Sequence, residues 1–261
     1  MNRSDGGEGP LLDVIGLTKS FGGIQALSQV SFRIEGKEIV SIIGPNGAGK
    51  TTFINVATGI HSPDQGEVRF KGRSIAGVPA HIRASLGMGR TFQLEELFSS
   101  MTVLENVLVG CHTRSHCGIF STGLKLSRAR GEETLMREEA MRSLAMVGLG
   151  HRASESISSL PLGERKMVGI ARALAMRVEL LMLDEPAGGL AVHEADILRR
   201  LIYELVNRGL AIILIEHNMP FVMSISERVI VFDYGRKIAE GSPQEVQSNP
   251  EVIRAYLGEE D

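Results

Sequence analysis

The sequence predicts an α/β fold in which helices cover both faces of a parallel sheet. Short, continuous apolar runs of the kind found in fully buried strands occur at residues 39–43, 180–183, 210–215 and 229–232. Residues 164–176 and 197–206 carry apolar side chains at helical spacing, and Gly209 is placed to end the second helix. This alternation of strands with helices favours parallel strand pairing.

The remaining patterns divide the chain into regions. Apolar alternation between residues 14 and 34 and a further run at 68–72 predict an N-terminal antiparallel β subdomain. Residues 101–152 have a helical pattern, which predicts an inserted α-helical subdomain. We therefore predict four regions: a disordered, polar leader at 1–10, a core with its β subdomain at 11–93 and 157–237, the helical subdomain at 94–156, and a C-terminal segment at 238–261.

Composition excludes several classes of protein. The chain has 28 Lys and Arg against 31 Asp and Glu, a net charge of -3, so we expect no nucleic-acid partner. Two cysteines and the lack of an apolar amino-terminal segment point to a reducing, cytosolic compartment. No apolar run approaches the roughly 20 residues that span a bilayer, so any membrane role must act through partners.

A glycine-rich segment, GPNGAGKT from Gly44 to Thr51, lies between the apolar run at 39–43 and a helical segment. Such a loop directs backbone N–H groups and a helix N-terminus at phosphate oxygens. Lys50 is expected to reach the β- and γ-phosphates, and the Thr51 hydroxyl to ligate Mg²⁺. A flexible loop with a stray lysine is the alternative, but the strand–loop–helix context favours a nucleoside triphosphate site. Its predicted binding residues are Gly44, Pro45, Asn46, Gly47, Ala48, Gly49, Lys50, Thr51 and Thr52.

Two other buried strands end in groups that can do chemistry. Asp184 and Glu185 follow the run at 180–183, at the carboxyl end where open α/β sheets bind ligands. Asp184 is placed to hold Mg²⁺ through water, and Glu185 to polarise the attacking water. His217 follows the run at 210–215 and is a candidate sensor of the γ-phosphate, although an isolated histidine there is more often an ordinary strand cap.

Five motifs occur in the order seen in ATP-binding subunits of ABC transporters, and the chain resembles this family over nearly its whole length. They are the phosphate loop, TFQ at 91–93, LPLGERK at 160–166, LMLDEP at 181–186 and IEHNM at 215–219. The segments FGGIQAL at 21–27, MGRTFQ at 88–93, MTVLENVLVG at 101–110 and GSP at 241–243 further resemble ATPase subunits of branched-chain amino acid importers. The resemblance implies a RecA-like P-loop NTPase core that hydrolyses ATP with Mg²⁺.

The resemblance also implies roles for single residues. Phe21 would stack on adenine, although a buried strand aromatic is equally common. Gln93 would contact Mg²⁺ and the attacking water. The residues of the metal site would then be Thr51, Gln93 and Asp184. The helical subdomain would dock a membrane subunit in a groove lined by four apolar residues. As an equally good alternative, these residues fill the core: Leu94, Leu97, Phe98 and Met101.

Two departures from the family pattern concern communication between subunits. The signature segment, usually LSGGQ, is here Leu160-Pro161-Leu162-Gly163-Glu164, so a hydroxyl and a backbone donor toward the partner's nucleotide are replaced. Pro161 suits the first turn of the following helix, whose N–H groups can still face an anion, whereas the Glu164 carboxylate would oppose it. Ala191 stands where the family commonly has Asp or Asn.

One phosphate loop and one signature require a second ATP-binding subunit, which is either a second copy of this chain or a different chain; the weakened signature favours a different chain. The resemblance implies permease partners, indirectly a periplasmic binding protein, and a location at the cytoplasmic face of the inner membrane. Alternatives are a soluble ABC ATPase, an exporter of lipid-linked glycans, and an importer of urea or amides. A GTPase would need an NKxD segment, which is absent, and a kinase would not explain the signature.

One cluster lies outside these motifs. Cys111, His112, His116 and Cys117 bring together ligand types that zinc accepts. Their spacing does not match common zinc sites, so we expect a polar surface loop.

Overall fold

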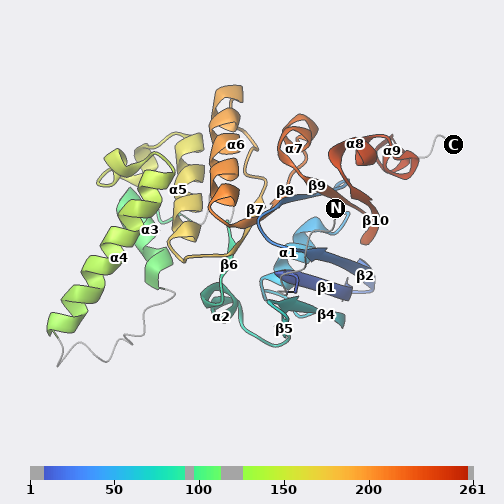
Figure 1. Ribbon diagram of the computed structural model, residues 1–261, viewed down its shortest axis with the longest axis horizontal. Helices are drawn as coiled ribbons and strands as arrows, with labels where there is room; N and C mark the ends of the chain where they lie inside the picture. Colours follow the sequence, from blue (N-terminus) through green and yellow to red (C-terminus); the bar gives the residue numbers. More distant parts are fainter. Residues whose placement is uncertain (1–8, 92–96, 113–125, 258–261) are drawn as a thin grey trace, which may run out of the picture.

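The computed structural model describes residues 9–91, 97–112 and 126–257 (Figure 1). Its centre is a six-stranded sheet in the order β10-β9-β3-β8-β7-β6. These strands are β3 (Ile39–Ile43), β6 (Met88–Arg90), β7 (Leu180–Asp184), β8 (Ala211–Ile215), β9 (Arg228–Asp233) and β10 (Arg236–Gly241). All pairs except β9 with β10 are parallel, which confirms the predicted parallel sheet.

Strand β10 adds an antiparallel edge that the apolar pattern did not predict. It returns beside β9 through Tyr234 and Gly235, whose φ angles are 41° and 77°. Two consecutive positive φ angles suit a tight hairpin, which reverses the chain without a helix. The strand is also only partly buried, so it carries no continuous apolar run.

A second sheet confirms the predicted β subdomain. It is antiparallel, in the order β2-β1-β4-β5, and consists of β1 (Leu12–Phe21), β2 (Ile24–Ile34), β4 (Gln65–Phe70) and β5 (Arg73–Ser74). Its inner face packs with α1 (Lys50–Ala57) on the central sheet. Rings of Phe32, Phe53 and Phe232, with centroids 5.1–6.4 Å apart, join the three elements. The short helix α2 (Ala80–Ser85) connects this region to β6.

Helices cover the other face of the central sheet. Here α5 (Leu162–Leu174) and α6 (Val192–Asn207) pack on β7 and β8 through residues such as Leu183 and Leu214. The alternate residues Leu180 and Met182 face α1 and the β subdomain, so the strands are buried on both faces. Helices α3 (Val103–His112) and α4 (Leu126–Met146) pack beside α5, and Figure 1 shows them projecting from the core.

The expectation of a polar surface loop at Cys111 is wrong. Cys111 lies within α3, where its side chain is 5% exposed and its thiol donates to the Met136 carbonyl of α4 at 3.5 Å. The cysteine therefore behaves as a small apolar core residue. His112 ends the helix and is exposed, whereas His116 and Cys117 lie outside the described residues. Among the described residues no group of His, Cys, Asp and Glu could hold a metal ion.

The chain closes with α7 (Met219–Ile225), α8 (Pro243–Gln247) and α9 (Pro250–Leu257). Ser242 and Glu245 cap α8 reciprocally, because the Ser242 N–H donates to the Glu245 carboxylate at 2.7 Å. No helix of the described part of the chain is long and apolar enough to cross a membrane. The first eight residues of the predicted leader lie outside the described residues.

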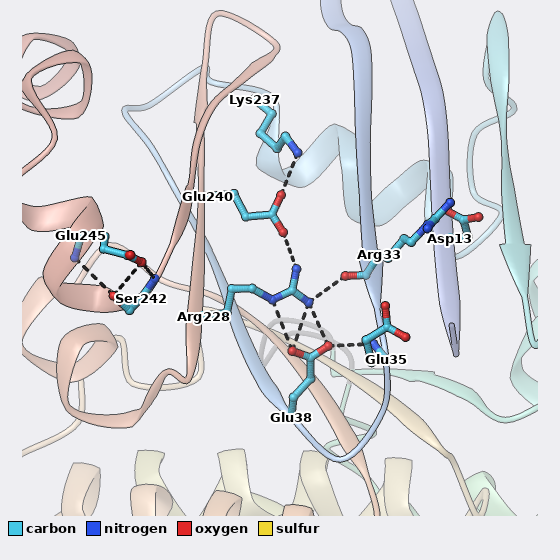
Figure 2. A network of polar contacts seen from close by, with 9 residues as sticks. All are labelled: Asp13, Arg33, Glu35, Glu38, Arg228, Lys237, Glu240, Ser242 and Glu245. Carbon is cyan, nitrogen blue, oxygen red and sulfur yellow. Dashed lines mark hydrogen bonds and ion pairs between the residues drawn. The ribbon is translucent and has the colours of Figure 1, made fainter. Parts of the chain in front are cut away.

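An ion network lies around the amino end of β9, at the edge of the sheet opposite the predicted phosphate site (Figure 2). Arg228, at the start of β9, donates to both carboxylate oxygens of Glu38 at 2.8 and 3.0 Å and to the Arg33 carbonyl at 2.7 Å. It also contacts Glu240, which accepts from Lys237 at 2.7 Å. The network thereby ties β9, β10 and the turn before β3 together.

Candidate functional site

The loop Gly44–Gly49 joins β3 to α1, and its backbone requires glycine at both of its ends. Gly44 and Gly49 have φ angles of 150° and 101°. A Cβ at Gly44 would lie 2.1 Å from the Phe232 carbonyl oxygen, and one at Gly49 would lie 2.4 Å from that of Ala26. Helix α1 has no side-chain cap and no acidic residue in its first turn, so its N-terminus suits an anion.

Lys50 is the first residue of α1 and folds back over the loop. Its Nζ donates to the carbonyl oxygens of Gly44 at 2.7 Å and Pro45 at 2.9 Å. Burial lowers the pKa of Lys50, whereas the carboxylates of Glu185 and Asp184 act in the opposite direction. The two carboxylates at the end of β7 therefore lie close enough to the phosphate loop to act on its lysine.

Asp184 is held by a residue that the sequence did not indicate. Its Oδ2 accepts from the Arg90 guanidinium at 2.9 Å, and the two side chains are only 9% and 10% exposed. Arg90 also donates to Asn55 Oδ1 at 2.6 Å, which links β6 and β7 to α1. Arg90 lies within the MGRTFQ segment, but that segment assigned it no role, because its position beside Asp184 follows from the pairing of β6 with β7.

Glu185 has a strained backbone and an exposed side chain. Its φ angle is 48°, a region that non-glycine residues seldom occupy, and its N–H donates to the Ile215 carbonyl at 2.9 Å. Its Oε1 lies 3.7 Å from Nδ1 of His217, and both side chains are about half exposed. The structure thus brings the two predicted catalytic groups together at the ends of adjacent strands.

The predicted signature segment lies where α5 begins. Pro161 immediately precedes the helix, which starts at Leu162, so the proline is just outside the first turn in which it was predicted. Glu164 forms an ion pair with Arg152 at 3.1 Å. The expected repulsion of an anion by Glu164 is therefore partly offset by Arg152.

These features match a known family. Residues 27–188 match the family described as "ABC transporter", and residues 236–261 match that described as "Branched-chain amino acid ATP-binding cassette transporter". The chain belongs to the ABC transporter family. Its phosphate loop, β7 carboxylates and signature segment are therefore parts of an ABC ATPase cassette.

The cassette is similar over almost its whole length to proteins of known role. It is 44% identical over 251 residues to the high-affinity branched-chain amino acid transport ATP-binding protein LivG of Salmonella typhimurium, covering 96% of this chain and 98% of the relative. It is 42% identical, with the same coverage, to the corresponding protein BraF of Pseudomonas aeruginosa.

Solved structures confirm the fold. A nucleotide-free ATP-binding cassette from an ABC transporter is 33% identical, with a TM-score of 0.85 over 96% of this chain and 100% of that one. A dimeric bacterial ABC transporter cassette is 25% identical, with a TM-score of 0.75 over 89% of this chain and 98% of that one. The combination of mixed sheet, antiparallel β subdomain and helical region is that of an ATP-binding cassette.

Other predicted site residues of the cassette lie as follows. Phe21 ends β1 and is 43% exposed, and its ring centroid lies 5.1 Å from that of His61 in an edge-on contact. Thr51 is exposed at the start of α1, and Thr52 is half-buried. Gln93 lies outside the described residues.

The junction of core and helical region is hollowed. A cavity of about 280 Å³ lies between the start of α5 and the end of β7, lined by residues that include Leu97, Leu162, Asp184 and Glu185. Of the predicted docking residues, Leu97 is partly buried against the helical core and Phe98 is exposed. Met101 is half-buried, and Leu94 is outside the described residues.

Proposed function

We propose that this chain is the ATP-hydrolysing subunit of an importer for branched-chain amino acids. The observation that carries the hydrolytic part is the convergence of the phosphate loop, Asp184, Glu185 and His217 at the carboxyl ends of β3, β7 and β8. Each group has the chemistry that one part of ATP hydrolysis requires, and the fold brings them to one edge of the sheet.

The residues divide the work of binding and hydrolysis. The backbone of Gly44–Gly49 and the N-terminus of α1 hold the phosphates, with Lys50 turning from its own loop carbonyls to the β- and γ-phosphates. Glu185 accepts a proton from the attacking water, because its carboxylate is exposed and is not committed to the Arg90 pair. His217 donates to the γ-phosphate and keeps the water in line.

Oxygen donors suited to Mg²⁺ lie at the same place. The exposed hydroxyl of Thr51 and the carboxylate of Asp184, acting through water, would hold the ion, and Gln93 would complete its surroundings. The ion would supply positive charge to the β- and γ-phosphates. Phe21, with its partly exposed ring, would stack on adenine.

We infer that the working unit is a pair of cassettes at the cytoplasmic face of the membrane. The signature residues at the start of α5 would close on a partner's nucleotide, as the dimeric relative supports. The departures at Pro161 and Ala191 favour a different chain as the partner. Permease subunits would dock at the helical region, and a periplasmic binding protein would deliver the cargo.

The cargo is inferred from similarity, because no cassette residue needs to contact it. Branched-chain amino acid transport is the role of the LivG and BraF relatives, and residues 236–261, which contain β10, α8 and α9, match a family model for branched-chain amino acid cassettes. Uptake of labelled leucine by proteoliposomes that contain the chain, its partner subunits and internal Mg-ATP would support the cargo. Uptake of urea or an amide instead, or activity without any permease, would exclude it.

The hydrolytic assignment has its own test in the same assembled transporter. Glu185→Gln should lower ATP turnover by about 100-fold or more, since a positioned general base contributes 10²–10⁴ in rate, while Mg-ATP still binds. Glu204→Gln is the matched control, because Glu204 is an exposed residue of α6 that pairs only locally with Arg208. Equal turnover in the two variants would contradict the role of Glu185.

A further inference from the structure

Glu216 is the one acidic residue in the described part of the chain that is completely buried. It directly follows β8, which ends at Ile215, and precedes His217. Its Oε1 accepts from the Ala187 N–H at 2.7 Å, and its Oε2 accepts from the N–H groups of His217 at 3.1 Å and Asn218 at 3.4 Å. A carboxylate in such a position is tolerated only because backbone donors replace its water.

Lys166 binds the carbonyl groups of the loop that contains Ala187. It lies in the first turns of α5, and its Nζ donates to the carbonyl oxygens of Glu185 at 2.9 Å, Pro186 at 3.1 Å and Gly188 at 2.6 Å. All three donors of the ammonium group are thus used on one short stretch of backbone. Burial lowers the pKa of Lys166, and the nearby carboxylates of Glu216 and Glu185 oppose this effect.

Together the two side chains hold the loop of residues 185–188 by its backbone. Glu216 accepts a hydrogen bond from the Ala187 N–H, and Lys166 donates to three carbonyl groups around it. The loop begins at Glu185, whose positive φ angle is a conformation that surrounding contacts must impose. Removal of either side chain would let the backbone relax and would turn the Glu185 carboxylate.

We propose that Lys166 and Glu216 are positioning residues for ATP hydrolysis: they clamp the backbone of residues 185–188 and so fix the direction of the Glu185 carboxylate. The proposal rests on the proposed role of Glu185. Neither side chain need touch the nucleotide. A pair of apolar residues of similar size would fill the same space without desolvating two charges, so stability alone is a weak reason for this arrangement.

The test compares Lys166→Met and Glu216→Gln with the parent in the assembled transporter. Each should lower kcat by about 10- to 100-fold, because small displacements of a catalytic group have effects of this size, while KM for Mg-ATP stays within about threefold. The matched control is Glu240→Gln, a partly buried carboxylate of the network in Figure 2. It should lower the midpoint of thermal unfolding and leave kcat unchanged.

The double variant separates a shared role from general damage. Because both residues act on one loop, their effects on kcat should not multiply. The kcat of the double variant, Lys166→Met with Glu216→Gln, should be no more than about threefold lower than that of the less active single variant. If the two effects multiply, or if both single variants keep kcat within about twofold of the parent while Glu185→Gln loses turnover, the clamp is wrong. If Glu185→Gln keeps full turnover, the proposed role of Glu185 fails and the clamp fails with it. Should Glu216→Gln not fold, Lys166→Met decides alone.

Discussion

Replacement of Arg90 by methionine tests how the carboxylate of Asp184 is held beside the phosphate loop. The ion pair between them is 2.9 Å long, and neither side chain is more than 10% exposed. Arg90→Met removes the cation and the hydrogen bond to Asn55 at 2.6 Å, and it leaves the Asp184 charge in a poorly hydrated position. Methionine keeps the flexible apolar stem of the side chain and removes the guanidinium, so the loss is mainly electrostatic.

The expected cost is large. Removal of one partner of a buried ion pair lowers the free energy of unfolding by about 3–5 kcal/mol. For a domain of this size that corresponds to a fall of roughly 6–20 °C in the unfolding midpoint. Since domains of this kind are stable by about 5–15 kcal/mol, the variant should still fold. Urea unfolding of the nucleotide-free chain, followed by circular dichroism, measures the change.

Two controls make the result specific. Arg199→Met removes an arginine from an exposed pair with Asp196 on α6 and should cost no more than about 1 kcal/mol. Arg90→Met combined with Asp184→Asn should cost less than the sum of the single changes, because the uncompensated charge is gone. An Arg90→Met cost that equals that of Arg199→Met would refute the reasoning, since the pair would then behave as a surface contact.

Three further predictions concern other parts of the chain. Gly49→Ala should abolish binding of a fluorescent ATP analogue, because its Cβ would lie 2.4 Å from the Ala26 carbonyl oxygen, whereas Gly47→Ala, with open space around its Cβ, should keep measurable binding at a backbone cost of about 1–2 kcal/mol. Pro161→Ser should raise the ATPase rate of the assembled transporter several-fold, because it restores a hydroxyl that can donate to the partner's nucleotide. A hydrogen bond to a charged group is worth about 1.5–3 kcal/mol. An unchanged rate would show that the signature is not limiting. Burial alone would raise the pKa of Glu240, but hydrogen bonds and ion pairs from Lys237 and Arg228 outweigh it and lower the pKa below its usual value. The stability that this carboxylate contributes is therefore present above its unfolded pKa and is lost as pH falls below it, so Glu240→Gln should flatten the pH dependence of the unfolding midpoint on the acid side of the usual glutamate pKa.

The sequence predicted those parts of the fold and site that local patterns encode. The run at 39–43 became β3 with the same bounds, and the apolar runs before Asp184 and Glu216 became β7 and β8. Because these strands are parallel neighbours, residues that follow them necessarily meet at one edge of the sheet. The approach of His217 to Glu185 is thus a consequence of topology that continuous apolar runs already indicate.

The residues that hold the site could not be predicted in the same way. Arg90 and Asp184 are 94 positions apart, and Ala187 and Glu216 are 29 apart. Lys166 and Glu216 both lie inside motifs, yet the motif assigns no partner to either. Cys111 was misplaced because adjacent polar residues suggested a loop, whereas packing of α3 against α4 buries its thiol. Such contacts depend on tertiary packing, which outweighs local composition.

Lys166 connects the signature segment at the start of α5 to the loop that begins at Glu185. The lysine lies two residues after Glu164, the last residue of the signature, and its ammonium group bonds the loop that begins at Glu185. A displacement of α5 relative to the sheet must therefore either break three charge-assisted hydrogen bonds or carry the loop with it. Because such bonds are short and directional, carrying the loop is the less costly response for small displacements. If the signature closes on a partner's nucleotide and Glu185 is the general base, as proposed, then the position of α5 governs both.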